Sequence, residues 1–352
     1  MEPLLSPDAG PILLVMLDRH LGNNVLSLPV AERLARYFTG PVELLVDARY
    51  VALARLACPS ARVQPAPSRG RRWRGPISEA RWARLFARCA AKRYAAVFDF
   101  GGSKRQARLT RATMSPIRIG LHGQYQWAYT HTVGQERDEH MYRRVSRLLE
   151  PIGDTTPPPW PELEADQSSR QRVQTTIAQR FGETPDSLLI LHPGAGRAYR
   201  RWPSERFAAV ADALIEKRGM HVIVIGSKTE RALGEQLRRE MQRPDRAAVM
   251  SFNLIELVAL FNQAALMVSN ESGPTHLASM TQLPIVTLFG PTKEQWWRPV
   301  REARLTALRG QTCDPRCTRE HCPVNLACLM NITTDDVLDA AGRVAPTIAI
   351  EQ

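Results

Sequence analysis

The chain has 352 residues, enough to bury two cores of ordinary domain size. Hydrophobic residues make up 44% and charged residues 23%, which is typical of a globular protein, and no apolar run is long enough to span a bilayer. The N-terminus carries Glu2 and Asp8 and lacks a basic start followed by a long apolar stretch. We therefore expect no secretory signal and a cytoplasmic protein.

The formal net charge of +12 predicts an anionic partner. Nucleic acid, an anionic membrane surface and a phosphorylated substrate would each satisfy it, and so would basic faces that are simply solvated. The basic residues are mostly arginines, grouped at 69–74, 104–111 and 197–201, without the alternation with aromatic rings that single-strand binding requires. Charge alone does not choose the partner, and we expect no nucleic acid.

The first half alternates strand and helix patterns. Short apolar runs of buried-strand length occur at 11–17, 42–46, 95–100 and 117–121. Apolar residues at helical spacing follow at 24–38, 50–58 and 78–94. Five prolines in 151–166 forbid regular structure there, so we expect this stretch to link an N-terminal domain (1–150) to a C-terminal domain (167–352).

The second half alternates more regularly. Strand patterns occur at 188–192, 221–225, 265–269 and 284–289. Helix patterns occur at 203–218, 229–241, 253–263 and 275–280, the third opened by a capping box of Asn253 and Glu256. Such repeated units predict an α/β protein with two Rossmann-like domains, each built on a parallel sheet, facing across a cleft. Ligands then bind at the carboxyl ends of the strands.

Three loops of this kind carry candidate chemistry. The first, 18–24, follows the first strand; Gly22 permits a tight turn, and Asn23 or Asn24 can cap a helix whose first turn attracts anions. An ordinary strand-to-helix turn is the alternative.

The second loop, 192–203, combines small residues with arginines. Small residues leave backbone N–H groups free to approach a phosphate, and arginine can neutralise a diphosphate as its bond breaks. A solvated basic turn is the alternative. The candidate phosphate contacts are Gly194, Ala195, Gly196, Arg200 and Arg201.

The third loop, 269–277, lies between a strand and a short helix. Ser272 and Thr275 can donate hydroxyl hydrogen bonds, and Gly273 lets backbone amides approach a ligand. Glu271 can bond a ribose or sugar hydroxyl. His276 is either a phosphate contact or a structural histidine.

Four segments, in this order along the chain, resemble one known family. They are LDRHLGNNVLSLP (17–29), FDFGGSKRQARLT (98–110), HPGAGRAYRRWP (192–203) and SNESGPTHLASMTQLPIVTLFGPT (269–292). The chain is similar in all four to the ADP-heptose–lipopolysaccharide heptosyltransferases of glycosyltransferase family 9. The resemblance covers nearly the whole chain and specifies the family more closely than the substrate.

The resemblance implies a GT-B fold and an inverting, metal-independent transfer of a heptose from ADP-heptose to a lipopolysaccharide core acceptor. It places the nucleotide sugar on the C-terminal domain and the acceptor on the N-terminal domain, with Ser103 and Lys104 in the acceptor segment. The expected partners are the nucleotide sugar, a lipid-linked phosphorylated saccharide and the anionic face of the inner membrane, where the protein would be peripheral.

Three positions depart from the family pattern. Arg200 stands where the family has lysine and keeps the charge, and Glu271 stands where the family has aspartate and is one methylene longer. Asn23 replaces the aspartate thought to be the general base, and an amide cannot accept a proton at neutral pH. We expect Asp18 or His20, in the same loop, to take that role. Otherwise the chain is a nucleotide-binding relative with impaired catalysis, or it uses another nucleotide sugar for a cell-surface glycan.

Four cysteines cluster within 313–328: Cys313, Cys317, Cys322 and Cys328. Thiolates in a cytoplasmic protein favour metal over disulfide, but the spacing departs from the paired C-x2-C form of common zinc sites. Structural zinc and reduced or oxidisable thiols stay open as alternatives. Neither is required for catalysis.

Overall fold

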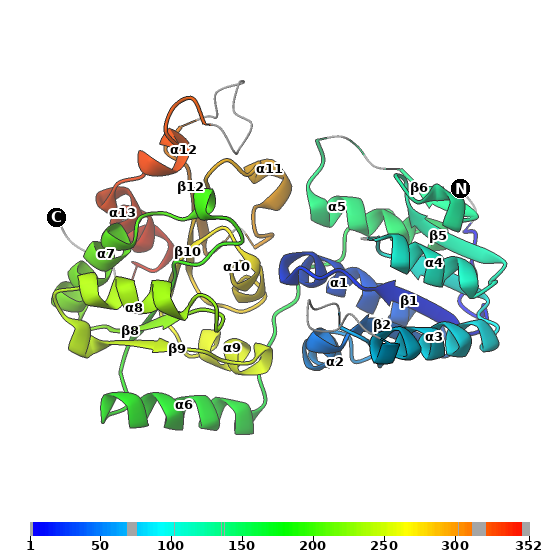
Figure 1. The fold of residues 1–352 in the computed structure, drawn as a ribbon, viewed down its shortest axis with the longest axis horizontal. Helices are drawn as coiled ribbons and strands as arrows, with labels where there is room; N and C mark the ends of the chain where they lie inside the picture. The colour runs from blue at the N-terminus through cyan, green and yellow to red at the C-terminus, as the bar shows by residue number, and fades with distance from the viewer. Residues whose placement is uncertain are drawn as a thin grey trace. The chain divides into compact units, whose positions relative to one another are not determined.

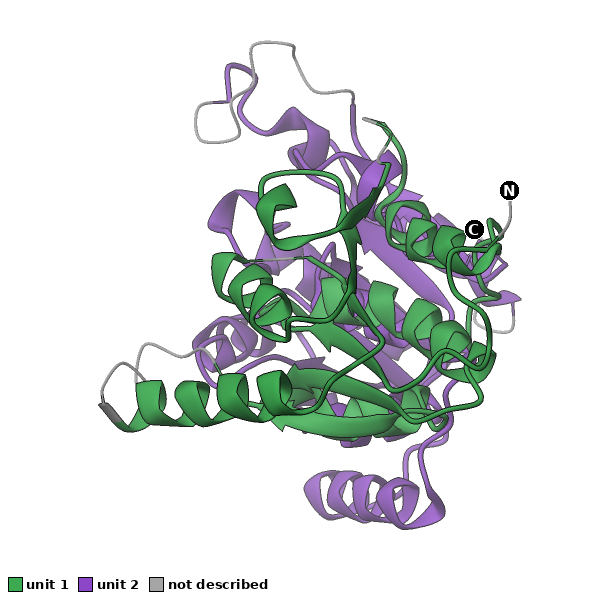
Figure 2. Ribbon diagram, turned by 90° about the vertical axis from the view of Figure 1, so that its right-hand side faces the viewer, with its two compact units in different colours: residues 1–161 green, residues 162–352 purple. Residues whose placement is uncertain are grey.

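The computed structural model describes residues 3–68, 76–101, 103–134, 136, 138–301, 303–311 and 322–346. The chain divides into two compact units, Met1–Pro161 and Glu162–Gln352, coloured separately in Figure 2. Residues 153–166 contain no helix or strand, and the division falls within this proline-rich stretch.

Unit 1 is a parallel six-stranded sheet in the order β3-β2-β1-β4-β5-β6. Its strands are β1 (Ile12–Met16), β2 (Val42–Asp47), β3 (Arg62–Ala66), β4 (Ala96–Asp99), β5 (Ile117–Leu121) and β6 (His131–Val133). Its α-helices are α1 (Leu21–Tyr37), α2 (Val51–Ala57), α3 (Pro76–Ala91), α4 (Lys104–Ala112) and α5 (Met141–Ser146), shown in Figure 1.

Unit 2 repeats this plan, with strand order β12-β11-β10-β7-β8-β9, again parallel. Its strands are β7 (Leu188–His192), β8 (His221–Ile225), β9 (Ala247–Met250), β10 (Leu266–Asn270), β11 (Ile285–Leu288) and β12 (Leu305–Leu308). Its α-helices are α6 (Gln167–Phe181), α7 (Ser204–Arg218), α8 (Arg231–Glu240), α9 (Leu254–Phe261), α10 (Gly273–Ala278), α11 (Glu294–Trp297), α12 (Ala327–Met330) and α13 (Thr334–Val344).

Numbered from its own first strand, each sheet has the doubly wound order 3-2-1-4-5-6. The chain changes direction across the sheet between β1 and β4 in unit 1, and between β7 and β10 in unit 2. Loops that leave the carboxyl ends of these strand pairs diverge and leave room for a ligand. The fold therefore marks one candidate site in each unit.

The strand runs are apolar because both faces of each sheet are covered. All five residues of β1, β7 and β8 are buried. Each unit has its own core. In unit 1 the core includes Leu13, Val15, Leu45, Trp82 and Val97, and in unit 2 it includes Leu189, Trp202, Phe207, Val222 and Val268.

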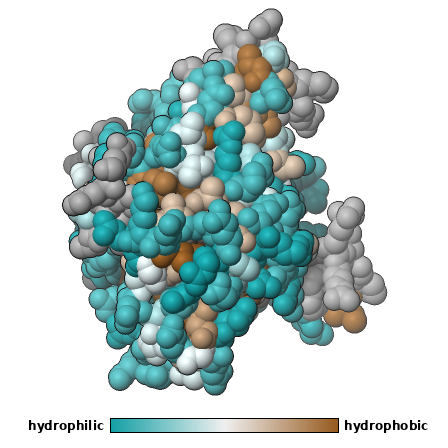
Figure 3. Space-filling model, turned by 90° about the vertical axis from the view of Figure 1, so that its left-hand side faces the viewer, coloured by the Kyte–Doolittle hydropathy of each residue, from teal (hydrophilic) through white to brown (hydrophobic). Residues whose placement is uncertain are grey.

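The face of the molecule drawn in Figure 3 is largely hydrophilic, with smaller apolar areas between the polar side chains. Four large hydrophobic side chains are well exposed among the described residues: Leu4, Ile77, Met114 and Trp127. Within the described ranges, no helix has the length and apolar content needed to cross a bilayer.

Candidate functional site

The loop after β7 is packed against the start of α8. A Cβ atom at Gly194 would collide with Glu230 Oε1 and lie 3.0 Å from His192 Nε2, so a larger residue here would force the Glu230 side chain to shift. A Cβ at Gly196 would meet nothing within 4 Å. The loop is therefore closely packed at Gly194 and has open space beside Gly196. A ligand could approach the backbone N–H groups there.

Glu230, the N-cap of α8, packs against this loop, and its separation of 36 residues from Gly194 left no local signal in the sequence. The Ser227 amide and hydroxyl donate to Glu230 Oε2 at 2.9 and 2.7 Å. Burial works against ionisation, but these hydrogen bonds keep the pKa of Glu230 below its ordinary value.

A chain of hydroxyl groups connects β7 to β10. His192 Nδ1 lies 3.0 Å from Ser272 Oγ, which lies 3.0 Å from Thr275 Oγ1. Thr275 Oγ1 in turn donates to the Asn270 carbonyl at 3.0 Å. Burial lowers the pKa of His192 to about 4, so its imidazole is neutral at physiological pH. The predicted residues Ser272 and Thr275 thus join the third loop to the second.

Arg200 and Arg201 are fixed by different partners. Arg200 Nη1 donates to Glu271 Oε2 at 3.2 Å, and Arg201 Nη2 donates to the Ala195 carbonyl at 3.1 Å. Burial raises the pKa of Glu271, and the Arg200 charge opposes that rise. The buried Nε atoms of both arginines have no hydrogen-bond acceptor within the part of the chain that the structure describes. Buried cationic donors left open in this way fit an anionic ligand.

Asn270, the last residue of β10, holds both ends of the loop between β7 and α7, and it was not among the predicted residues. Its Oδ1 accepts the Trp202 amide at 3.0 Å, and its Nδ2 donates to the Pro193 carbonyl at 2.8 Å. The Trp202 indole donates to the Ile332 carbonyl at 3.1 Å, which anchors the end of the basic loop to the C-terminal segment. A polar residue ending an apolar strand run was the signal available in the sequence.

The remaining predicted residues of unit 2 lie on α10 and in the turn after β11. Gly273 is the first residue of α10, and His276, on the same helix, is 2% exposed. A Cβ at Gly290 would lie 3.5 Å from the Tyr199 carbonyl, so the FGPT turn packs beside the basic loop.

In unit 1, Asp18 in the loop after β1 pairs with Asn23 in the first turn of α1. The N-cap of that helix is His20, so the expectation that Asn23 or Asn24 caps it is wrong. Asn23 Nδ2 donates to Asp18 Oδ2 at 2.9 Å, and the His20 amide donates to Asp18 Oδ1 at 2.7 Å. The His20 imidazole is exposed and accepts from Arg19 Nε at 3.1 Å. The Asn24 side chain donates to the Asp18 and His20 carbonyls at 2.9 and 2.8 Å and so closes the turn.

Asp18 and Asn23 line a cavity of about 400 Å³, and His20 does not. The cavity lies at the carboxyl ends of β1, β4 and β5, where unit 1 changes winding direction. The remaining lining comes from the ends of β1 and β5, the loops after β4 and β5, α1 and α5: Met16, Leu26, Ser27, Phe100, Gly101, Leu121, His122, Gly123, Gln124, Tyr125, Tyr129, Met141 and Val145.

A buried polar network holds the strand ends beneath this cavity. Gln106 Oε1 accepts the Leu17 amide at 3.2 Å, while its Nε2 donates to the Val15 carbonyl at 2.8 Å and to Asp99 Oδ1 at 2.5 Å. Thr110 Oγ1 donates to Asp99 Oδ2 at 2.7 Å. Burial raises the pKa of Asp99, and these hydrogen bonds oppose the rise.

The predicted acceptor residues Ser103 and Lys104 do not line the cavity. Ser103 is the N-cap of α4, where its hydroxyl accepts the Gln106 amide at 3.3 Å. Lys104 is exposed at the first position of that helix.

Half of the cysteine cluster can be placed. Cys313 and Cys317 lie outside the described residues. Cys322 is a free thiol whose Sγ accepts the Leu326 amide at 3.1 Å, and Cys328 is buried. Within the described ranges no three His, Cys, Asp or Glu side chains are grouped to hold a metal ion. Structural zinc and reduced or oxidisable thiols both stay as alternative predictions for this cluster.

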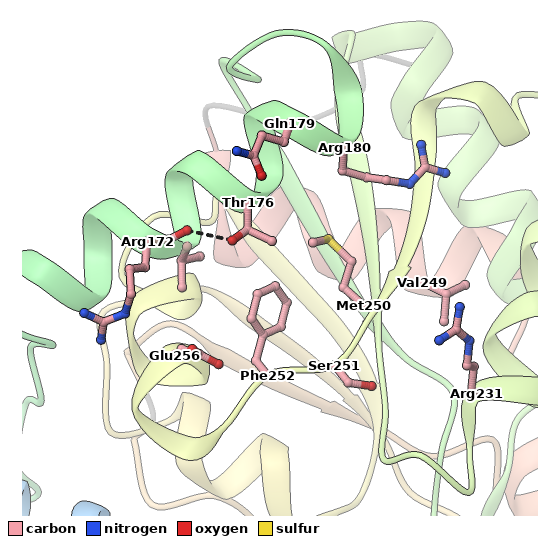
Figure 4. Close-up of a pocket in the computed structure, with 11 residues that line it drawn as sticks. Arg172, Thr176, Gln179, Arg180, Arg231, Val249, Met250, Ser251, Phe252 and Glu256 are labelled. Carbon is pink, nitrogen blue, oxygen red and sulfur yellow. Dashed lines mark hydrogen bonds between the residues drawn. The ribbon is translucent and has the colours of Figure 1, made fainter.

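A second cavity, of about 600 Å³, lies in unit 2 between α6, the end of β9 and α8 (Figure 4). Arg172, Arg180 and Arg231 border it, and the Thr176 hydroxyl donates to the Arg172 carbonyl at 2.8 Å. None of the predicted site residues lines it.

Comparison with known proteins agrees with this arrangement. A family model described as glycosyltransferase family 9 (heptosyltransferase) matches residues 82–327. The chain is 26% identical over 231 residues to lipopolysaccharide heptosyltransferase 3 of Escherichia coli K12, covering 64% of this chain and 65% of that protein. It is 30% identical over 148 residues to lipooligosaccharide heptosyltransferase 2 of Haemophilus influenzae, covering 40% and 41%. The chain thus spans less than two thirds of the length of these curated relatives.

Solved structures share the fold. The TM-score is 0.83 to a family 9 glycosyl transferase from Veillonella parvula, at 22% identity, covering 97% of this chain and 99% of that one. It is 0.77 to E. coli ADP-heptose lps heptosyltransferase II, at 18% identity and 95% and 98% coverage. It is 0.66 to E. coli heptosyltransferase WaaC with ADP-2-deoxy-2-fluoro heptose, at 18% identity and 93% and 97% coverage. The fold is GT-B, and because the family model spans most of its length, the chain belongs to glycosyltransferase family 9, the heptosyltransferases.

Proposed function

We propose that the chain is an inverting, metal-independent glycosyltransferase that moves a heptose from ADP-heptose to a lipopolysaccharide core acceptor. The observation that carries the proposal is the Arg200–Glu271 pair at the winding reversal of unit 2, with buried arginine Nε atoms directed to no acceptor among the described residues. Family membership supplies the donor class, since the solved WaaC structure contains an ADP-heptose analogue.

Unit 2 would bind the donor. Arg200 and Arg201 neutralise the diphosphate, the amides of 194–196 approach it closely, and the 271–276 loop contacts the sugar and ribose hydroxyls. Arg200 can do this because Glu271 fixes only one of its terminal nitrogens. Neutralising the leaving group in the transition state is the role that accelerates the reaction.

Unit 1 would bind the acceptor. One acceptor hydroxyl oxygen attacks the anomeric carbon of the heptose, a new C–O bond forms on the opposite face, and the bond to the β-phosphate oxygen breaks. The hydroxyl proton passes to a general base, and ADP leaves with the bonding electron pair. No metal is needed if the arginines carry the charge.

Asp18 is the proposed base. It lines the cavity of unit 1, whereas His20 is exposed and does not. Two hydrogen bonds orient its carboxylate, and each oxygen keeps a lone pair for a substrate proton. Asn23 then acts as a positioning residue that holds Asp18, in place of the aspartate that the family resemblance leads one to expect.

The charge of +12 supports the remaining partners. A phosphorylated, lipid-linked acceptor lies in an anionic membrane, and a basic protein would be drawn to that surface. We therefore propose a peripheral location on the cytoplasmic face of the inner membrane.

A donor screen tests the function. Purified protein is incubated with a lipopolysaccharide core acceptor and each of several nucleotide sugars, and extended acceptor is detected by mass. We expect product and acceptor-dependent ADP release with ADP-heptose. Product with a different nucleotide sugar would correct the donor, and ADP binding without any product would favour a catalytically impaired relative.

Substitutions at Asp18 and His20 test the base. Asp18→Asn should lower kcat by about 100-fold or more, the usual contribution of a general base, with ADP affinity unchanged. His20→Ala should retain near wild-type turnover. The reverse result would assign the base to His20, and full activity in both variants would exclude either residue.

A further inference from the structure

The cavity of unit 1 has an unusual charge for a protein with a net charge of +12. Its described lining contains one carboxylate, Asp18, one imidazole, His122, and neither arginine nor lysine. The rest is amide, hydroxyl, aromatic and aliphatic. A phosphate or carboxylate entering this cavity would face Asp18 with no guanidinium or ammonium group on the described walls to compensate its desolvation.

The floor of the cavity is rigid. The Tyr129 ring lies directly over Gly120, where a Cβ atom would overlap the ring atoms. The Tyr129 hydroxyl bonds to the buried carboxylate of Asp99, which also accepts from Gln106, Thr110 and the Gly101 amide. Both the face and the tip of the tyrosine are therefore fixed before any ligand arrives.

The walls combine flat apolar surface with hydrogen-bonding groups. Tyr125 and Phe100 supply aromatic surface, while Asn23, Ser27 and Gln124 supply amides and a hydroxyl. Its volume of about 400 Å³ is within the usual range of small-molecule sites, about 300–1,000 Å³. An uncharged ring that is apolar on its face and hydroxylated at its edge matches this lining.

We propose that this cavity receives the acceptor sugar that carries the reacting hydroxyl, and that it selects a neutral sugar over a phosphorylated or carboxylated one. The inference rests on the proposed function and adds specificity to it. The reacting hydroxyl lies at Asp18, and the ring packs on Tyr125 and Tyr129. Phosphates elsewhere on the acceptor stay outside the cavity.

The direct test uses two acceptors that are identical except for a phosphate on the terminal sugar. With ADP-heptose as donor, the full-length protein should show kcat/KM at least about tenfold higher for the neutral sugar, which corresponds to a modest binding difference. Equal values, or a preference for the phosphorylated sugar, would overturn the inference while leaving the transferase function intact.

Two substitutions locate the selectivity. Tyr125→Ala should raise KM for the neutral acceptor about tenfold without changing KM for ADP-heptose. Trp127→Ala is the matched control, because Trp127 is a nearby aromatic residue, 46% exposed, that does not line the cavity. If Trp127→Ala has the larger effect, the cavity is not the acceptor site.

Met141→Lys places an ammonium group on the cavity wall. It should raise kcat/KM for the phosphorylated acceptor relative to the neutral one, and an unchanged ratio counts against the proposal. If wild-type protein binds ADP but transfers to neither acceptor, the proposed function fails separately. Saturation-transfer NMR then decides: binding of the neutral fragment, lost in Tyr125→Ala, supports the cavity assignment, and no binding overturns it.

Discussion

At the scale of single residues, Asp18 and Asn23 form a hydrogen-bonded pair in which only one member can accept a proton. The Asn23 amide donates to the Asp18 carboxylate, which is the only anionic group of the pair. The replacement of aspartate by asparagine therefore does not by itself remove the capacity for base catalysis. It changes which member of the pair can perform it.

Restoring the second carboxylate gives a prediction with a definite sign. In Asn23→Asp, two carboxylates would lie about as close as the present 2.9 Å contact, and such a pair retains one proton to higher pH. The acid limb of kcat/KM should therefore move to higher pH. The pH–rate profile measures this, with His20→Ala as a control that should overlay wild type. An unmoved limb would mean that Asp18 is not the titrating base.

His192 gives a prediction for stability. Burial lowers its folded pKa to about 4, whereas an exposed imidazole titrates near pH 6.5. The unfolded chain therefore binds a proton between these values that the folded chain refuses, so the free energy of unfolding falls as pH drops from about 6.5 to about 4. Urea midpoints across this range should fall less steeply in His192→Gln than in wild type. Identical slopes would contradict the assignment.

At the scale of elements, Asn270 holds both ends of the loop between β7 and α7, at Pro193 and at Trp202. Asn270→Ala removes both hydrogen bonds and leaves the Trp202 amide and Pro193 carbonyl unpaired, at a cost of about 1–3 kcal/mol for each buried group. ADP affinity, measured by calorimetry, should fall because both donor loops loosen.

Asn262→Ala is the matched control for that substitution. Asn262 also makes two hydrogen bonds in unit 2, accepting the Ala165 amide and donating to the Leu163 carbonyl, each at 3.0 Å. It should lose comparable stability and keep its ADP affinity. An equal loss of affinity in both variants would show that the Asn270 effect is general destabilisation.

The elements also show where sequence reasoning succeeds. The strand predictions at 188–192 and 221–225 are confirmed as β7 and β8. A short, continuous apolar run between turns fits a strand in a parallel sheet whose two faces are both buried. The capping box at Asn253 is confirmed as well. Helix α6 was missed because Val173 and Ile177 are its only buried apolar residues.

The site was predictable only where its residues are close in sequence. The residues of 194–201 and 271–275 carry local motifs, and the structure joins them through Ser272, Asn270 and Arg200. Gln106 accepts a hydrogen bond from the Leu17 amide, 89 residues away in the sequence, and no local pattern predicts such a contact. The cavity residues 121–125 and Tyr129 form no motif and are defined only by the fold around them.

At the scale of the whole molecule, the two units have the same strand order but different site chemistry, cationic in unit 2 and nearly uncharged in unit 1. We therefore expect ADP to bind to unit 2 and not to unit 1. In hydrogen exchange of the full chain, saturating ADP should slow exchange in 193–202 and 270–276, by as much as about 100-fold at 100 times Kd, and leave 121–129 unchanged. Protection centred on 121–129 would place the nucleotide on the wrong unit.

Both units secure their site loops with a side-chain carboxamide that accepts one backbone amide and donates to one backbone carbonyl: Gln106 in unit 1 and Asn270 in unit 2. A carboxamide has no proton to gain or lose across the range in which proteins stay folded. These carboxamides therefore keep the same donors and acceptors at every pH at which the protein is folded. A pH-dependent change in the loops would instead have to start at a titratable neighbour, at Asp99 in unit 1 or at His192 in unit 2.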